Sequence, residues 1–417
     1  MLNENNKNII RNQIRRFLLE YFLHEQEKEA IKVKFPIEKI IPNEAIRTDI
    51  LNIKNIFVEN GYKLYLVGGS VRDALLNKVP KDYDLATDAP PDAMIQMLQH
   101  LYKIMEIGKA FGIINVVTPS GELEIARFRA DVGSGRRPES VEFTTIERDV
   151  LRRDLSINAL FYDLDTQEII DYVGGIEDLK KGIIKTVGNP EERFNEDRLR
   201  ILRVVRFSAR FGSELDAETD KALQQDSSLE GISSERIRDE FLKGIKSAKS
   251  VIQFLEMLKR YKLFNWIFPD LKIGKFIEEK NPIILLAFLL KQNPIEKLKE
   301  ILNKLSYTND EIKKIIFLIY FSKLNKRNAF EKSKAFEKNK FNIVFLKKLQ
   351  PVSGLTDDEI KQFAKLIGLD EKLTNAFLNF NLSISGGDIA KQGFKGPEIS
   401  REVERLELAN FKELYKK

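Results

Sequence analysis

The sequence predicts an α+β head built on a mixed sheet with flanking helices, followed by an all-α neck, body and tail. Two observations support this prediction. Between about Thr48 and Tyr172, short apolar runs of strand length alternate with helical segments. After about Gly174 the strand pattern fades, apart from residues 184–187, and helical periodicity interrupted by prolines continues to the end of the chain.

The strand segments of the head are short and are bounded by turn residues. Turns at residues 119–121 and 165–167 suit β-hairpins. An amphipathic helix is predicted over residues 9–21, in an N-terminal arm of residues 1–47. The predicted strands are residues 64–67, 82–85, 112–117, 123–129, 159–164 and 168–172. The predicted domains are the arm, a head (48–172), a neck (173–247), a body (248–330) and a tail (331–417).

Composition narrows the classes of protein to which the chain can belong. Its 417 residues include no cysteine, which excludes disulfides, thiolate catalysis and cysteine-ligated zinc. The net charge of +6 permits a polyanionic partner but does not identify one, and no feature points to a protein partner. The longest apolar stretch, Pro282–Leu290, is too short to span a bilayer, and the N-terminus lacks an apolar signal core. We therefore expect a cytoplasmic protein with no membrane segment.

A glycine turn and a pair of aspartates lie close together near the start of the head. The turn of residues 68–70 follows the first strand, and Asp82 and Asp84 lie on the next. Since successive side chains on a strand point to opposite faces, the two carboxylates share one face. Mg²⁺ binds one or two carboxylates plus substrate phosphate oxygens, and a turn without side chains lets phosphate approach the backbone. Either feature alone is usually an ordinary turn or a solvated pair. No Walker A motif or dinucleotide fingerprint is present.

Six ordered motifs extend from this turn to about Lys243. They are GGSVRD with DYDLAT (68–73, 82–87), GRRP with VEF (135–138, 141–143), RRDLSINAL (152–160), DYVGGIEDL (171–179), EDRLR (196–200) and SERI with Glu240 (234–237). Together they resemble the motifs of class II tRNA nucleotidyltransferases and bacterial poly(A) polymerases, members of the polymerase-β-like nucleotidyltransferase superfamily. Leu155, Ser156 and Arg148 depart from the usual pattern, but none of them replaces a catalytic group.

The resemblance implies nucleotidyl transfer in which Asp82 and Asp84 bridge two Mg²⁺ ions, about 4 Å apart in such sites. One ion would lower the pKa of the primer's 3′-hydroxyl, and the other would hold the phosphates of the nucleotide. Polymerase-like sites often add a third carboxylate from a neighbouring strand. Glu124 is our candidate, and a solvated strand charge is the alternative. Arg72 would bind phosphate with its planar guanidinium, which is compatible with an ion pair to Asp73 or Asp84.

Nucleotide choice is assigned to the segment of residues 196–206, which we expect to be one helix with Asp197, Arg200 and Arg203 on roughly one face. Such charges usually form surface ion pairs, but the apolar residues between them indicate a largely buried helix whose arginines need partners. ATP and CTP each present an exocyclic amine beside an acceptor, whereas GTP and UTP present a carbonyl there. The resemblance implies that Asp197 and Arg200 read this edge in place of a template. The expected nucleotide-binding residues are Gly68, Gly69, Ser70, Arg72, Arg153, Asp154, Asn158, Glu196, Asp197, Arg200, Arg203 and Arg206.

Within the family, the sequence favours addition of C, C and A to the 3′ end of tRNA from CTP and ATP. The GRRP segment resembles tRNA nucleotidyltransferases, and EDRLR lacks the proline typical of poly(A) polymerases. The long basic C-terminal extension of those polymerases is also missing. The resemblance makes the neck nucleotide-selecting and the tail tRNA-binding. The lysine-rich residues 323–348 could contact RNA or form a solvated surface. A poly(A) polymerase, an A-adding or CC-adding enzyme, and a silent RNA-binding protein remain alternatives.

Overall fold

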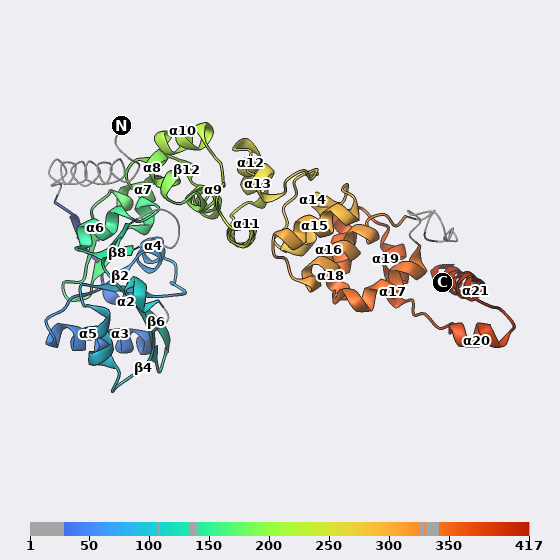
Figure 1. The fold of residues 1–417 in the computed structure, drawn as a ribbon, viewed down its shortest axis with the longest axis horizontal. Coiled ribbons are helices and arrows are strands. Elements are labelled where there is room, and N and C mark those ends of the chain that lie inside the picture. Colours follow the sequence, from blue (N-terminus) through green and yellow to red (C-terminus); the bar gives the residue numbers. More distant parts are fainter. Residues whose placement is uncertain (1–28, 107, 133–139, 326–328, 330–341, 417) are drawn as a thin grey trace, which may run out of the picture. The chain divides into compact units, whose positions relative to one another are not determined.

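The computed structural model describes residues 29–106, 108–132, 140–325, 329 and 342–416. It divides into two compact units (Figure 1). The first comprises Met1–Arg200 and Glu214–Ala222, and the second comprises Ile201–Ser213 and Leu223–Lys417. The helix expected over residues 9–21 lies outside the described residues. The finer division into arm, head, neck, body and tail stays a prediction.

An eight-stranded mixed sheet forms the centre of the first unit, as expected. The strand order is β1-β10-β9-β2-β3-β6-β5-β4. Among the described strands of this sheet, β3 and β6 run parallel and every other neighbouring pair runs antiparallel. The strands are β1 (Ile31–Lys34), β2 (Leu64–Val67), β3 (Asp84–Thr87), β4 (Lys103–Met105), β5 (Ile113–Thr118), β6 (Gly121–Arg127), β9 (Phe161–Asp163) and β10 (Glu168–Asp171).

Each strand predicted in the head is present, with boundaries that differ by at most two residues, but the two edge strands and the strand pair of residues 129–132 and 140–143 were not predicted. Both expected hairpins are present, between β5 and β6 and between β9 and β10. The first is fixed by Asp49, whose carboxylate accepts the backbone N–H of Ser120 at 2.9 Å. The edge strands β1 and β4 were not predicted, because β1 is exposed along its whole length and β4 has three residues. β3 begins at Asp84, so Asp82 lies just before the strand rather than on it.

Helices cover one face of the sheet through a large apolar core. Ile50 and Phe57 of α3 and Met94 of α5 pack with the strand residues Leu66 and Leu85. Helices α3 (Glu44–Glu59) and α5 (Pro91–Leu98) contact each other on this face (Figure 1). The short helices α2 (Ile37–Ile40), α4 (Gly69–Leu75) and α7 (Gly175–Lys181) contribute residues to the same core.

A smaller core lies on the opposite face. Tyr65, Phe128 and Phe161 form a cluster of rings with centroids 5.8 to 6.3 Å apart, and Val150 of α6 (Ile146–Leu151) packs with them. Since Leu85 faces the larger core, strand alternation places Asp84 on this second face. The other elements that begin in the first unit are η1 (Lys109–Phe111), β7 (Arg129–Val132), β8 (Ser140–Phe143), η2 (Ser156–Asn158), β11 (Ile183–Ile184), α8 (Pro190–Glu196), α9 (Leu199–Phe211), β12 (Glu214–Leu215) and α10 (Ala217–Gln225).

The DYVGGIEDL motif forms the connection from β10 to α7. The Asp171 carboxylate accepts the backbone N–H groups of Val173, Gly174, Gly175 and Ile176 at 2.8 to 3.0 Å. A Cβ on Gly175 would lie 2.2 Å from the Ser156 carbonyl oxygen, so only glycine fits there. The motif therefore has a structural role, which is to hold the start of α7 against η2.

The described residues of the second unit contain helices and no strand, which confirms the all-α expectation. Helix α14 is apolar along almost its whole length and packs against α16 and α18. No helix of the described residues is long and apolar enough to cross a membrane. The helices are α11 (Ser234–Ser247), α12 (Val251–Arg260), α13 (Phe264–Ile267), α14 (Pro282–Leu290), α15 (Ile295–Lys304), α16 (Asn309–Phe321), α17 (Ile343–Ser353), α18 (Asp357–Leu366), α19 (Glu371–Asn379), α20 (Gly386–Lys391) and α21 (Pro397–Lys416).

Candidate active site

A row of polar side chains crosses three neighbouring strands on the face of the smaller core. Asp84 of β3 is the register partner of Glu124 of β6, and Glu124 is in turn the partner of Asn115 of β5. Asp82 and Asp84 are exposed, whereas Tyr83 between them is buried, so the two aspartates share one face. The structure thus has Glu124 on the strand beside Asp84, where a third carboxylate was expected. Its role in catalysis stays a prediction.

The carboxylates of this row repel one another. Withdrawal from water raises the pKa of Asp84, and Asp82 adds to the rise while Arg153 opposes it. Withdrawal from water also raises the pKa of Glu124, with a further contribution from Asp84. Within the described part of the chain, none of the three carboxylates forms an ion pair or hydrogen bond. Asp82, Asp84 and Glu124 are called the acidic row below. Arg153 and Arg129 offset only part of their mutual repulsion, so the row attracts a cation.

The acidic row is suited to an ion that needs only one or two protein ligands, and not to an ion that needs a complete shell of them. In the described residues, no three acidic or histidine side chains form a ready cluster for one ion. Mg²⁺ does not need one, because it binds one or two carboxylates and completes its shell with phosphate oxygens and water. The Asn115 Oδ1 atom, buried with no hydrogen-bond partner among the described residues, is a further oxygen in the row whose polar requirement is unmet.

Arg72 lies in a buried network beside the glycine turn. Its guanidinium pairs with Asp73 through Nε and Nη2, at 2.8 and 2.7 Å, and donates through Nη1 to the Asn158 side chain. Asn158 donates in turn to Asp154 at 3.1 Å. Of the two ion pairs considered for Arg72, the structure contains the one with Asp73. The Arg72 side chain is almost completely buried, so little of its guanidinium is open to a phosphate.

Arg153 connects this network to the acidic row. It donates to the buried Asp149 at 3.0 and 3.2 Å, lies over the Phe161 ring, and lowers the pKa of Asp84. Burial disfavours the charge on Asp149, yet Arg153 and Arg152 hold the pKa of this carboxyl below its usual range. Gly68 has a φ of +67°, and a Cβ there would lie 3.5 Å from Arg153 Nη1. The positive φ favours glycine at this position, whereas a Cβ would make only ordinary van der Waals contact with Arg153.

Of the other turn residues expected to bind nucleotide, Ser70 does not expose its side chain. Its hydroxyl donates to the Val67 carbonyl at 3.3 Å and the residue is buried. Gly69 begins α4, and a Cβ on it would lie 3.6 Å from Arg72 Nη2. Phosphate could therefore meet the backbone of this turn but not the serine hydroxyl.

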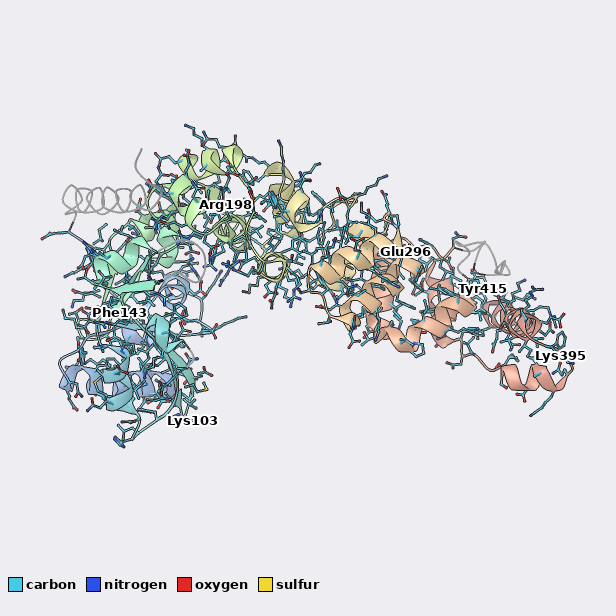
Figure 2. The ribbon with its side chains drawn as sticks, in the orientation of Figure 1. Lys103, Phe143, Arg198, Glu296, Lys395 and Tyr415 are labelled. Carbon is cyan, nitrogen blue, oxygen red and sulfur yellow. The ribbon has the colours of Figure 1, made fainter. Side chains whose placement is uncertain are left out.

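The EDRLR segment is two helices rather than one, which corrects the expected helix over residues 196–206. Helix α8 ends at Glu196, Asp197 is extended, and α9 begins at Leu199. The Asp197 carboxylate accepts the N–H of Leu199 at 3.0 Å, so this aspartate caps α9. The reason for the break is that a capping aspartate competes with helix continuation. Arg198, labelled in Figure 2, donates to Asn195 at 2.9 Å.

Arg200 joins the segment to the arginine network, which comprises Arg72 with Asp73 and Asn158 and Arg152 and Arg153 with Asp149. It donates to Glu196 at 2.6 Å and to the carbonyl oxygens of Arg193 and Arg152 at 3.2 and 3.0 Å. These bonds occupy both N–H groups of Nη1 and one of Nη2. Among the described residues, its Nε–H and second Nη2–H have no hydrogen-bond acceptor, so two of the five donors of a guanidinium are available.

Arg203 and Arg206 belong to the second unit. The prediction that their helix, α9, is largely buried is correct, and both arginines have protein partners. The buried Arg206 donates to Glu240 of α11 at 2.6 Å, and Arg203 lies 3.9 Å from the same carboxylate. Glu240 belongs to the SERI motif helix, whose N-cap is Ser233. The motif therefore supplies the counter-charge for these arginines.

The GRRP segment, residues 135–138, lies outside the described residues, as does most of residues 323–348. The strands that flank GRRP, β7 and β8, pair antiparallel. Phe143 at the end of β8, labelled in Figure 2, packs under the Arg127 guanidinium at 4.1 Å. A Cβ on Gly112 would lie 2.9 Å from its ring, so that glycine makes room for Phe143.

A family model matches the part of the chain that contains the glycine turn and the acidic row. Residues 64–185 match the family described as "Poly A polymerase head domain", and residues 212–273 match "Probable RNA and SrmB- binding site of polymerase A". A CCA-adding enzyme of Staphylococcus saprophyticus is 33% identical over 380 residues, which cover 85% of this chain and 94% of that protein. The chain belongs to the poly(A) polymerase and CCA-adding enzyme family.

Other members of the family match over shorter stretches. A CCA-adding enzyme of Bacillus pumilus is 41% identical over 203 residues, 48% of this chain and 50% of the relative. A poly(A) polymerase I of Salmonella typhi is 33% identical over 271 residues, 60% of this chain and 57% of the relative. The chain thus spans about half the length of several curated relatives that it matches.

Solved structures share the fold. The chain is similar to a CCA-adding enzyme in its apo form II, with a TM-score of 0.69, 22% identity and coverage of 91% of this chain and 95% of the other. It is also similar to a Thermotoga maritima CCA-adding enzyme complexed with tRNA, with a TM-score of 0.64, 21% identity and coverage of 93% and 98%.

Sequence reasoning missed two residues of the site. Asp149 pairs with Arg152 and Arg153, and its spacing of three and four residues from them within a helical segment was an available signal. Asn115 has no comparable signal, because its place beside Glu124 depends on the pairing of β5 with β6.

Proposed function

We propose that this chain adds C, C and A to the 3′ end of tRNA, using CTP and ATP, by metal-dependent nucleotidyl transfer. The observation that carries the proposal is the acidic row, in which Asp82, Asp84 and Glu124 remain without partners beside the glycine turn. Membership of a family whose relatives are named CCA-adding enzyme and poly(A) polymerase supports the same reaction type.

Asp82 and Asp84 would hold Mg²⁺, and Glu124 is the third carboxylate that could join them. When bound, two such ions would lower the pKa of the RNA 3′-hydroxyl and neutralise charge on the departing pyrophosphate. The chain itself contributes position. Arg153, held by Asp149, moderates the negative charge around Asp84, and the turn at Gly68 admits the phosphates.

Selection of the base is assigned to Asp197 and Arg200. The two unoccupied donors of Arg200 can meet a ring nitrogen or carbonyl oxygen, and the Asp197 carboxylate can accept from an exocyclic amine. CTP and ATP each present that amine, so one pair of side chains can accept either nucleotide. With UTP or GTP, the carboxylate would face a carbonyl oxygen, and the repulsion disfavours binding.

Poly(A) synthesis is the second candidate, because a poly(A) polymerase I matches 60% of the chain. The extent of the matches favours CCA addition. The alignment with the Staphylococcus saprophyticus CCA-adding enzyme covers 94% of that protein, whereas the alignment with the poly(A) polymerase covers 57%. Addition of only A or only CC would use the same chemistry, so the acidic row does not separate these activities from addition of the full triplet.

The product length on a defined RNA tests the proposal. A tRNA that lacks its 3′ triplet is incubated with CTP alone, with ATP alone, and with both nucleotides. We expect two additions with CTP alone, none with ATP alone, and three additions followed by a stop with both. Long adenosine tracts on any RNA would identify a poly(A) polymerase, and a product that ends after CC or requires a preformed CC end would identify a specialised enzyme.

A further inference from the structure

A basic pocket lies in the second unit, where α12 and α13 meet the extended segment that follows them. Its volume is about 290 Å³, and no acidic residue lines it. Lys259 is in the last turn of α12, and Lys262 follows in the turn to α13. The lining residues are Lys259, Lys262, Phe264, Asn265, Ile273, Gly274 and Phe276.

Aromatic and cationic groups are combined at this pocket. The rings of Phe264 and Phe276 lie 5.8 Å apart, and Lys259 Nζ is 5.9 Å from the Phe276 ring centre. Lys259 and Lys262 are exposed, and in the described residues neither forms an ion pair with a carboxylate. Between residues 259 and 276 the chain has five basic residues and one acidic residue: Lys259, Arg260, Lys262, Lys272, Lys275 and Asp270.

The walls of the pocket are fixed by the fold. The Gly274 N–H donates to the Leu289 carbonyl at 2.8 Å, which ties the segment to the end of α14. Lys272 exchanges two bonds of 2.8 Å with the buried Asn293 side chain, one through its N–H and one through its carbonyl. Lys262 has a φ of +58°, a conformation uncommon for residues other than glycine, and this directs the chain around the corner of the pocket.

We propose that this pocket binds one unpaired nucleotide of an RNA strand, with the base against Phe276 and the adjoining phosphates on Lys259 and Lys262. Sites for single-stranded nucleic acid combine stacking on aromatic rings with a cationic path for the backbone, and the pocket has both. The choice of RNA rests on the proposed function. The family description quoted above covers residues 212–273 as a whole and names no individual residue. The proposed site is one pocket, whose lining extends beyond that range to Phe276.

Binding measurements without catalysis test the pocket. A fluorescently labelled single-stranded RNA of ten nucleotides is titrated with the full chain by anisotropy, in EDTA and without nucleotide, over a series of KCl concentrations. For Lys259→Gln with Lys262→Gln, we expect about tenfold weaker binding and a salt slope lower by about 1.4, since each phosphate contact contributes about 0.7 for single strands.

The matched control is Lys299→Gln with Lys361→Gln, which changes the net charge equally at exposed positions of α15 and α18. It should bind the RNA nearly as well as the wild type. Phe276→Leu retains an apolar side chain but removes the ring, and we expect about fivefold or greater weakening with an unchanged salt slope. Emission of Trp266, the chain's single tryptophan, reports the folding of each variant during denaturation.

Equal binding by the pocket variants and the control would overturn the proposal, as would unchanged binding by Phe276→Leu. Because no nucleotide is added and metal is chelated, failure here is separate from failure of CCA addition.

Discussion

Two groups of charged residues lie close to each other in the head, since Arg153 of one acts on Asp84 of the other, and they are built on opposite principles. In the arginine network, each carboxylate has a cation: Asp149 pairs with Arg152 and Arg153, and Asp73 pairs with Arg72. In the acidic row, Asp82, Asp84 and Glu124 have no such partner among the described residues, and the pKa values of Asp84 and Glu124 are raised.

The difference distinguishes residues that maintain the site from residues that act in it. A buried charge without a partner costs stability, so a paired network is what a fold needs in order to keep arginines inside. Carboxylates that repel one another do not favour folding, whereas the proposed Mg²⁺ would offset their repulsion when it binds. Removing a member of each group should therefore have opposite effects on activity and stability.

The largest expected effect is on catalysis. Asp82→Ala or Asp84→Ala should reduce nucleotide addition by about 10³-fold or more, because the charge that would hold Mg²⁺ against the phosphates is lost. The thermal midpoint and the far-UV spectrum should stay close to those of the wild type. Turnover is measured as pyrophosphate release, and near-normal turnover by either variant would refute the metal assignment.

The next effect is on stability. Asp149→Ala leaves two arginines without their buried carboxylate and should lower the free energy of unfolding by about 3–5 kcal/mol. Because the pKa of Asp149 is lowered in the fold, its contribution is present above the ordinary carboxyl pKa of 3.8 and is lost as pH falls through the lower folded value. Urea denaturation at several pH values should show the gap between wild type and variant closing in acid. A constant gap would contradict the pairing.

Nucleotide choice should change by a smaller factor. Asp197→Ala is expected to relax the selection of CTP and ATP over UTP and GTP by about 10-fold or more. The structure adds a complication, since this side chain also caps α9, and alanine costs about 1 kcal/mol at such a position. Asp197→Ser keeps a capping oxygen without the charge, so it should relax selection with little loss of stability. Unchanged preference in the serine variant would remove the role of Asp197 in selection.

The smallest expected effect is a gain in stability. Asp84→Asn removes repulsion within the acidic row and should raise stability at pH 7 by at most about 1 kcal/mol, because the side chain is partly in solvent. A raised pKa means that the wild type loses stability as pH rises above 3.8, so the gain should vanish in acid. Added Mg²⁺ should stabilise the wild type and not the variant, which thermal melting can measure. Equal Mg²⁺ effects would place the ion elsewhere.

Much of the head was predictable because its signals are local. The strand before the glycine turn and the two hairpins follow from short apolar runs and turn residues. Asp82 and Asp84 were expected to share a face, and both are exposed on either side of the buried Tyr83, although Asp82 precedes the strand. The break in EDRLR was missed because the residue types that read a base also cap a helix, and spacing alone does not separate the two roles. The edge strand β1 was missed because it has no buried side chain.

Contacts between residues far apart in the chain could not be predicted from the sequence. The engagement of Arg72 with Asn158 joins residues that are 86 positions apart, and the pairing of Arg206 with Glu240 depends on how α9 packs against α11. The place of Asn115 in the acidic row follows from a strand register that no single segment encodes. Motif recognition found residues of the correct type, whereas their partners required the fold.

The hairpin held by Asp49 and Ser120 has a consequence for how the chain can vary in length. Glu124 lies three residues after the first residue of β6, and a shift of this strand by one residue against β3 would turn its side chain from the face of Asp84 into the apolar interior. Insertions and deletions are tolerated in most surface loops. In this loop, a change that shifted the register of β6 by one residue would remove the neighbour of Asp84 as completely as a substitution at Glu124 itself.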